Sequence, residues 1–217
     1  MMRHFETVVF DVDGTLLDTT EGVLASVKYT IEQFGLNNLA EEQLKAFIGP
    51  PIQDSFARTY GLDGPILQEL ATVFRNRYKS VDLLKAKPYE GIYEVFEELV
   101  KNEKKIAVAT YKRQDYATEI LKHFGFDKYT NILYGADHEN KLKKKDIIEK
   151  CLHDTGTLDY EKAVMIGDSD NDAIGAEKIG ISFIGVTYGF GFKAKEDVEK
   201  YSNVGCARQP WQILEFL

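Results

Sequence analysis

The stretch Phe10-Asp11-Val12-Asp13-Gly14-Thr15-Leu16 places two carboxylates and a glycine directly after the apolar run Val8-Val9-Phe10. This pattern is typical of a buried strand that ends in a turn. Because alternate strand residues share a face and the chain turns at Gly14, we expect the side chains of Asp11 and Asp13 to converge. Two carboxylates this close repel each other unless a cation or a shared proton lies between them. A solvated Asp-Gly turn is the alternative interpretation of these residues taken alone.

Composition and charge exclude several classes of protein. The chain has 217 residues, 44% hydrophobic and 29% charged, which is enough for a sizeable core and lies between one and two domains. A net charge of -8 argues against nucleic acid or an anionic membrane as the main partner, because basic faces bind phosphate backbones. Cys151 and Cys206 form no CxxC pattern, so neither a disulfide framework nor a zinc site is predicted. Since residues 1–5 lack a signal-peptide core and no apolar run approaches the ~18 residues that span a bilayer, we expect a cytoplasmic protein.

A long helical segment follows the first strand. Apolar residues at helical spacing stripe successive segments between about residues 16 and 84, and no strand pattern interrupts them. The predicted helices run from Asp18 to Gly35, from Glu41 to Ile48, from Ile52 to Gly61 and from Leu67 to Tyr78. The sequence therefore predicts an all-helical cap domain, residues 16–84, inserted into a core made of residues 1–15 and 85–217.

From Pro88 onward, helices alternate with short apolar strands. Strands are expected at residues 106–110, 131–134, 163–166 and 181–186, in addition to the first. Continuous apolar strands that alternate with helices predict a Rossmann-like α/β core, a parallel sheet with helices on both faces. Ligands of such sheets bind at the carboxyl ends of the strands, near the topological switch point.

The residues that could carry chemistry all fall at that edge of the predicted sheet. Asp11 and Asp13 follow the first strand, Thr110 ends the second, and Asp168 and Asp172 follow the fourth. Four neighbouring carboxylates need a cation, and oxygen ligands without His or Cys favour a hard metal ion such as Mg²⁺. For residues 167–172 taken alone, an acidic helix start that complements the helix dipole is the alternative.

These motifs, in their order and spacing, resemble those of the haloacid dehalogenase-like (HAD) phosphohydrolases, in particular the phosphoglycolate phosphatase-like members with a helical cap. The resemblance implies that Asp11 is the nucleophile that forms an aspartyl-phosphate. It implies that Asp13 protonates the leaving group and then activates water. It also implies metal contacts from Asp11, the backbone carbonyl of Asp13 and Asp168, with Asp172 close by or bonded through water.

The remaining motifs of the family are matched less closely. Thr110 resembles the second motif, whose hydroxyl binds phosphate oxygens, and Tyr111-Lys112 follows where the family often has a small or amide residue and then Lys. The third motif is a lysine that balances the charge of nucleophile and phosphate. Comparison of residues 144–148 with the family favours Lys144 among the competing lysines Lys141, Lys143, Lys144 and Lys145. Thr110, Tyr111 and Lys144 are thus candidate substrate-binding residues. The glycine-rich stretch 185–191 and residues 47–51 also resemble the subgroup.

The sequence therefore leads us to expect a Mg²⁺-dependent phosphatase that hydrolyses a small phosphomonoester of the phosphoglycolate type. A 5′-nucleotidase, a pyrophosphatase and a β-phosphoglucomutase-like phosphoryl transferase are the alternatives. A phospho-accepting receiver domain of signalling proteins is the non-enzymatic alternative, against which the helical insertion and the chain length speak, although fold alone would not separate them. The expected partner is a small phosphorylated metabolite, and the expected state is a monomer or a homodimer.

Overall fold

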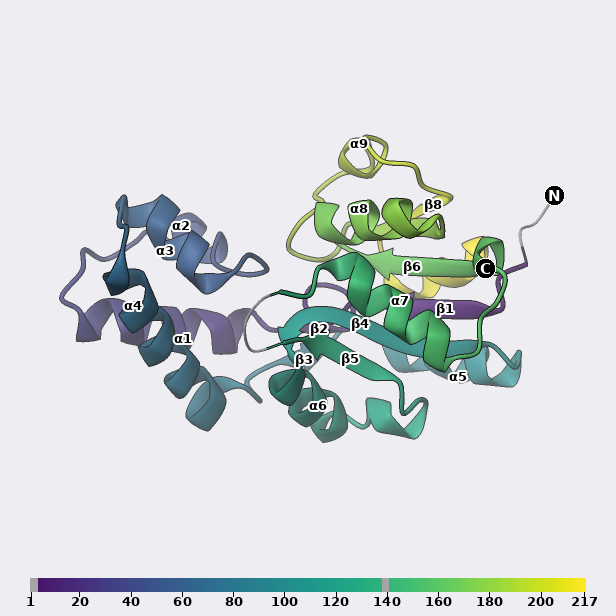
Figure 1. Ribbon diagram of the computed structural model, residues 1–217, viewed down its shortest axis with the longest axis horizontal. Coiled ribbons are helices and arrows are strands. Elements are labelled where there is room, and N and C mark those ends of the chain that lie inside the picture. The colour runs from purple at the N-terminus through teal and green to yellow at the C-terminus, as the bar shows by residue number, and fades with distance from the viewer. Residues whose placement is uncertain (1–3, 138–140) are drawn as a thin grey trace. The chain divides into compact units, whose positions relative to one another are not determined.

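The computed structural model describes residues 4–137 and 141–217, which divide into two compact units (Figure 1). The first unit comprises the chain up to Asp18 and from Pro88 onward, and the second is Thr19–Lys87. Residues 1–3, on which part of the signal-peptide argument rests, lie outside the described residues. Within the described ranges, no helix has both the length and the apolar character needed to cross a membrane.

The first unit is built on a six-stranded sheet in which every pairing is parallel, and this confirms the predicted fold class. The strands are β1 (Thr7–Phe10), β4 (Lys105–Arg113), β5 (Leu133–Ala136), β6 (Ala163–Gly167), β7 (Ser182–Val186) and β8 (Gly205–Ala207), in the order β5-β4-β1-β6-β7-β8. The chain builds outward from β1 to β5 on one side and then returns to build β6 to β8 on the other. The order therefore reverses beside β1, and ligands of such sheets bind at this point.

Helices cover both faces of the sheet, and the side chains of β1 show why. Val9 belongs to the buried cluster that includes residues of α7 (Lys144–Asp154) and α8 (Asp170–Ile179). Phe10 points to the other face, where it stacks on Phe96 of α5 (Ile92–Lys101) with ring centroids 4.8 Å apart. All four β1 residues are fully buried, as expected for the central strand of a parallel sheet. The remaining helices of this unit are α6 (Gln114–His123), α9 (Lys195–Val198) and the 3₁₀ turns η2 (Phe126–Lys128), η3 (Tyr160–Lys162) and η4 (Pro210–Phe216).

Three strand predictions need correction. β4 runs to Arg113 rather than ending at Thr110, with an irregular register against β5 between Ala109 and Arg113. β5 lies at Leu133–Ala136 rather than at 131–134. β8 was not predicted, because its sequence Gly-Cys-Ala is too short to show a strand pattern, and it is held by pairing with β7.

The second unit is helical. It contains α1 (Thr20–Gln33), α2 (Glu41–Lys45), α3 (Ile52–Tyr60), α4 (Pro65–Arg77) and the π-helical turn η1 (Tyr78–Asp82), and α4 packs against both α1 and α3. The helix predicted to reach Ile48 ends at Lys45 and is followed by a turn and a bend, and Gly49 has a φ of 101°. The prediction of helix throughout residues 16–84 is wrong at Leu17–Asp18, which form β2, paired with β3 (Lys87–Pro88) in a separate two-stranded sheet.

Candidate active site

Three buried carboxylates meet at the carboxyl ends of β1 and β6. Each of Asp11, Asp168 and Asp172 offers an oxygen within 4.8 Å of the others. Asp11 directly follows β1, Asp168 directly follows β6, and Asp172 lies in the first turn of α8. The parallel sheet brings them together because β1 and β6 are neighbours in register, with Phe10 opposite Ile166. The predicted convergence of carboxylates at the switch point is therefore present for Asp11, Asp168 and Asp172.

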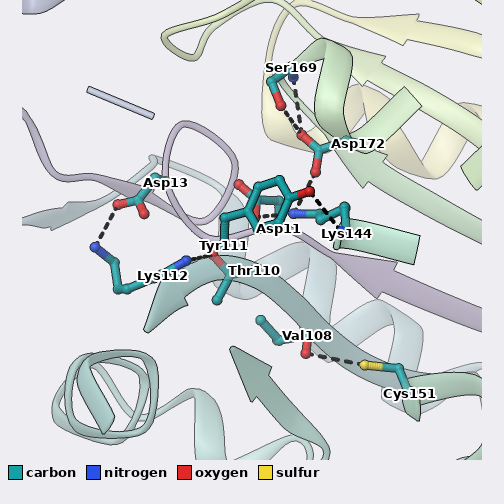
Figure 2. Close-up of polar contacts among 10 residues, drawn as sticks. All are labelled: Asp11, Asp13, Val108, Thr110, Tyr111, Lys112, Lys144, Cys151, Ser169 and Asp172. Atoms are coloured by element: carbon teal, nitrogen blue, oxygen red, sulfur yellow. Dashed lines mark hydrogen bonds and ion pairs between the residues drawn. The ribbon is translucent and has the colours of Figure 1, made fainter. Parts of the chain in front are cut away.

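The ammonium group of Lys144 lies inside this acidic cluster (Figure 2). Its Nζ atom is 2.6 Å from Oδ1 of Asp11 and 2.6 Å from Oδ1 of Asp172. Lys144 is the first residue of α7 and is only 3% exposed, whereas the competing lysines Lys141, Lys143 and Lys145 are exposed. Of the four candidates that the sequence left open, the structure brings Lys144 to the carboxylates.

Room for the Lys144 stem comes from a glycine that sequence reasoning did not single out. A Cβ atom on Gly175 of α8 would lie 2.9 Å from Cγ of Lys144 and 3.1 Å from Cδ1 of Ile148. Gly175 therefore allows α7 and α8 to approach closely enough for the lysine to pass between them. The sequence alone does not distinguish Gly175 from a helix glycine without a packing role, so this role could not be predicted.

Burial and mutual repulsion shape the charges of the cluster. Burial raises the pKa of Asp11 to about 8, and Asp172, Asp168 and Asp13 add to the rise against the lowering effect of Lys144. Burial raises the pKa of Asp168 to about 7, with Asp172 adding to it. Burial lowers the pKa of Lys144, but attraction to Asp11 and Asp172 outweighs it and leaves the pKa above its ordinary value. The lysine thus stays charged, and one ammonium does not neutralise three carboxylates.

A glycine-rich loop after β7 holds Asp168. Its Oδ2 atom accepts hydrogen bonds from the backbone N–H groups of Phe190 (2.6 Å) and Gly191 (2.9 Å). A Cβ atom on Gly191 would lie 2.3 Å from the carbonyl oxygen of Asp168, and one on Gly14 would lie 2.1 Å from Oδ2. Glycine is therefore required at both positions, because Gly14 packs on the carboxylate of Asp168 and Gly191 on its backbone.

Asp172 is fixed by the residues that begin α8. Its Oδ2 atom accepts hydrogen bonds from the backbone N–H (3.2 Å) and the hydroxyl (2.7 Å) of Ser169. A Cβ atom on Gly167 would lie 2.3 Å from Cγ of Asp172, so the end of β6 has to be glycine. The proposed alternative, an acid that merely complements a helix dipole, does not explain why this side chain is fully buried and ion-paired with Lys144.

The hydroxyl groups of Thr110 and Tyr111, beside the cluster, each accept a hydrogen bond from a backbone N–H group. Thr110 is 1% exposed, and its Oγ1 atom accepts a hydrogen bond from the backbone N–H of Lys112 at 3.1 Å. The hydroxyl of Tyr111 accepts a 2.8 Å hydrogen bond from the backbone N–H of Lys144. Tyr111, predicted as a substrate-binding residue, thus satisfies an N–H group at the start of α7, which has no partner within the helix.

Asp13 stands apart from the three clustered carboxylates. Its Oδ1 atom is 3.1 Å from Nζ of Lys112, in an ion pair whose side chains are 20% and 6% exposed (Figure 2). The prediction that the side chain of Asp13 converges with that of Asp11 is therefore corrected, because Asp13 pairs with Lys112 and Asp11 pairs with Lys144. Among the described residues, the possible metal-binding group contains Asp11, Asp168 and Asp172 and not the carboxylate of Asp13. The resemblance implies a metal contact only through the backbone carbonyl of Asp13, and this stays a prediction.

Residues 8–186, from β1 to the end of β7, match the sequence profile described as haloacid dehalogenase-like hydrolase. The chain belongs to this family. A 5′-nucleotidase of Pseudomonas aeruginosa is 35% identical over 87% of this chain and 85% of its own length. The pyrophosphatase PpaX of Halalkalibacterium halodurans is 31% identical over 85% of each chain. Among solved structures, a haloacid dehalogenase-like hydrolase of Streptococcus pneumoniae, 28% identical, superimposes with a TM-score of 0.89 over 98% of both chains.

The family predicted from the motifs is thereby confirmed, and the protein is a phosphatase of the HAD family. Membership in a family of hydrolases leaves the receiver-domain alternative without support. The matched region includes every candidate residue, from Asp11 to Asp172.

The residues of this HAD phosphatase fit a divalent metal ion. Three buried carboxylates offer only oxygen ligands within 4.8 Å of one another, and hard cations such as Mg²⁺ prefer such ligands. Within the part of the chain that the structure describes, Lys144 pairs with Asp11 and Asp172, and one ammonium offsets only one of the three charges that the carboxylates carry when all are ionised. Asp11, Asp168 and Asp172 are the residues that would hold it.

Proposed function

We propose that the protein is a Mg²⁺-dependent phosphatase that hydrolyses a small phosphomonoester through an aspartyl-phosphate on Asp11. The observation that carries this proposal is the placement of Asp11, whose carboxylate lies 2.6 Å from the ammonium of Lys144 and within 4.8 Å of two further buried carboxylates. When bound, Mg²⁺ supplies positive charge that offsets the repulsion between phosphate and carboxylate.

In the first half of the reaction, an oxygen of Asp11 attacks phosphorus, and the bond between phosphorus and the ester oxygen breaks. The leaving alkoxide takes a proton from the carboxyl group of Asp13. Lys144 faces Asp11 with a compact positive charge that attracts the transferring group. Thr110, buried within β4, binds a phosphate oxygen through its hydroxyl.

In the second half, a water molecule attacks phosphorus, and the bond between phosphorus and Asp11 breaks. Asp13, now a carboxylate, accepts a proton from this water, which restores the starting state of both residues. One carboxyl group thus serves as acid and then as base. Inorganic phosphate leaves, and the enzyme is ready for another cycle.

The proposed substrate class rests on the net charge of the protein, on its sequence motifs and on the names of its relatives. The net charge of -8 disfavours polynucleotides, and a compact phosphomonoester such as phosphoglycolate is the substrate inferred from the motifs. The Pseudomonas aeruginosa relative named 5′-nucleotidase favours nucleoside monophosphates as a second candidate, and the relative named pyrophosphatase favours pyrophosphate as a third. We further propose that the helical unit Thr19–Lys87 acts as a cap that selects the leaving group, and that the enzyme works in the cytoplasm as a monomer or a homodimer.

A panel assay tests this function. The purified protein is incubated with phosphoglycolate, AMP, pyrophosphate and a phosphopeptide, each with Mg²⁺ or with chelator, and kcat/KM is measured from phosphate release. We expect turnover that depends on Mg²⁺ and is highest for one of the small substrates. Preference for the phosphopeptide, or equal rates in chelator, would contradict the proposal, whereas preference for AMP or pyrophosphate would select among its substrates. Size-exclusion chromatography of the same sample reports the oligomeric state.

A further inference from the structure

Lys112 is a nearly buried lysine that touches two functional groups of the site (Figure 2). Its ammonium lies 3.1 Å from Oδ1 of Asp13, and its side chain is only 6% exposed. Its backbone N–H donates to the hydroxyl oxygen of Thr110 at 3.1 Å. Taking an ammonium out of water costs free energy, which a close carboxylate offsets. The pair is therefore a largely buried contact rather than a surface ion pair.

The backbone of Lys112 is held on both sides. Arg113 forms a double ion pair with Asp115, with N–O distances of 2.6 Å from Nε and from Nη2, at the point where β4 ends and α6 begins. On the neighbouring strand, a Cβ atom on Gly135 would lie 2.4 Å from the carbonyl oxygen of Lys112, so β5 approaches at van der Waals distance. The extension of β4 beyond Thr110 thus fixes where the lysine stem begins.

We propose that Lys112 is a positioning residue for Asp13, whose ammonium holds one oxygen of the acid–base carboxyl group and so restricts its rotation. This inference rests on the proposed role of Asp13 as acid and base. The backbone N–H of the same residue occupies one acceptor site of the Thr110 hydroxyl, which in the proposed function donates its proton to a phosphate oxygen. Lys112 therefore couples the group that binds phosphate to the group that moves the proton.

The test uses the leaving group as a readout. 4-Nitrophenolate departs without protonation, whereas the alkoxide of AMP or phosphoglycolate needs the proton of Asp13. We expect Lys112→Met to lower kcat/KM for the alkyl phosphate on the order of tenfold to a hundredfold, and that for 4-nitrophenyl phosphate by less than about threefold. Lys112→Arg keeps the charge and should recover most of the loss. The matched control is Lys105→Met, an exposed lysine at the other end of β4, which should behave as wild type.

A double variant separates action through Asp13 from other effects. If Lys112 acts through Asp13, then Lys112→Met in an Asp13→Asn background should lower kcat/KM no further than Asp13→Asn alone. Equal losses for both substrates in Lys112→Met, or a further loss in the double variant, would overturn the inference. If Asp13→Asn itself shows no dependence on the leaving group, the proposed role of Asp13 fails instead. Should Lys112→Met not fold by circular dichroism, Lys112→Gln and Lys112→Arg carry the same comparison.

Discussion

A Cβ atom on Gly189 would lie 2.4 Å from Oδ2 of Asp168 and 2.2 Å from the carbonyl oxygen of Gly14. The loop backbone therefore packs directly against the carboxylate of Asp168, which accepts hydrogen bonds from the backbone N–H groups of Phe190 and Gly191. A side chain at this position would push the loop away and break those hydrogen bonds. The glycine-rich stretch after β7 thus serves to hold Asp168 in place.

We expect Gly189→Ala to lower kcat/KM at least tenfold and to weaken Mg²⁺ binding, because Asp168 would lose its position. Forcing a methyl group into a packed site should also lower the free energy of unfolding by about 1–3 kcal/mol. Phosphatase assays at increasing Mg²⁺ and urea unfolding measure the two effects. Gly156→Ala is the control, since its Cβ atom meets nothing within 4 Å although its φ of 66° strains an alanine. It should lose stability and keep its turnover, and equal activity in the two variants would contradict the role of Gly189.

Lys144→Met should lower kcat by about a hundredfold or more, because it removes a preorganised positive charge beside the attacking carboxylate. Lys145→Met is a matched control one residue along α7, where the lysine side chain is 48% exposed. The steady-state rates of the two purified variants are compared at saturating Mg²⁺. A Lys144→Met enzyme as active as Lys145→Met would remove Lys144 from the mechanism.

Asp11→Asn should abolish turnover while it leaves the fold intact, since the amide has the same shape but cannot attack phosphorus. Asp13→Asn should slow both halves of the reaction and still form a phosphoenzyme. Mass spectrometry of acid-quenched protein detects the phosphoenzyme, and circular dichroism checks the fold. Substantial activity in Asp11→Asn would rule out the covalent route.

Stability should depend on pH and Mg²⁺ together. In the metal-free enzyme, burial raises the pKa of Asp11 to about 8 and that of Asp168 to about 7, above the ~4 of an unfolded aspartate. Between pH 4 and 8 the folded state then binds more protons than the unfolded state at these two groups, so their contribution to the free energy of unfolding falls as the pH rises. Mg²⁺ stabilises the ionised carboxylates and should reverse this fall.

The measurement is the difference in Tm between Mg²⁺ and chelator at pH 6 and at pH 8. We expect the difference to widen at pH 8, because fewer protons compete with the metal there. A difference in Tm that does not change with pH would show that the two carboxylates do not bind the ion.

Ca²⁺ should support turnover poorly, since it favours looser coordination than Mg²⁺.

The strand and helix pattern of the core was readable from the sequence because its strands are buried on both faces. Continuous apolar runs such as those of β1 and β6 show where a parallel sheet lies without any knowledge of neighbours. β8 and the end of β4 were not readable, since pairing with β7 and with β5 stabilises them rather than their own residue pattern. Local propensity does not record such partners.

The sequence by itself determined that Asp11, Asp13, Asp168 and Asp172 lie at one edge of the sheet, because carboxyl ends of parallel strands meet there. Only the tertiary structure decided that Lys144, rather than Lys141, Lys143 or Lys145, reaches Asp11. It also decided that Lys112 pairs with Asp13 and that glycines hold Asp168. These contacts join residues that lie far apart in the chain. They depend on how side chains are buried and how closely backbones approach one another, and a local pattern of residue types does not encode either.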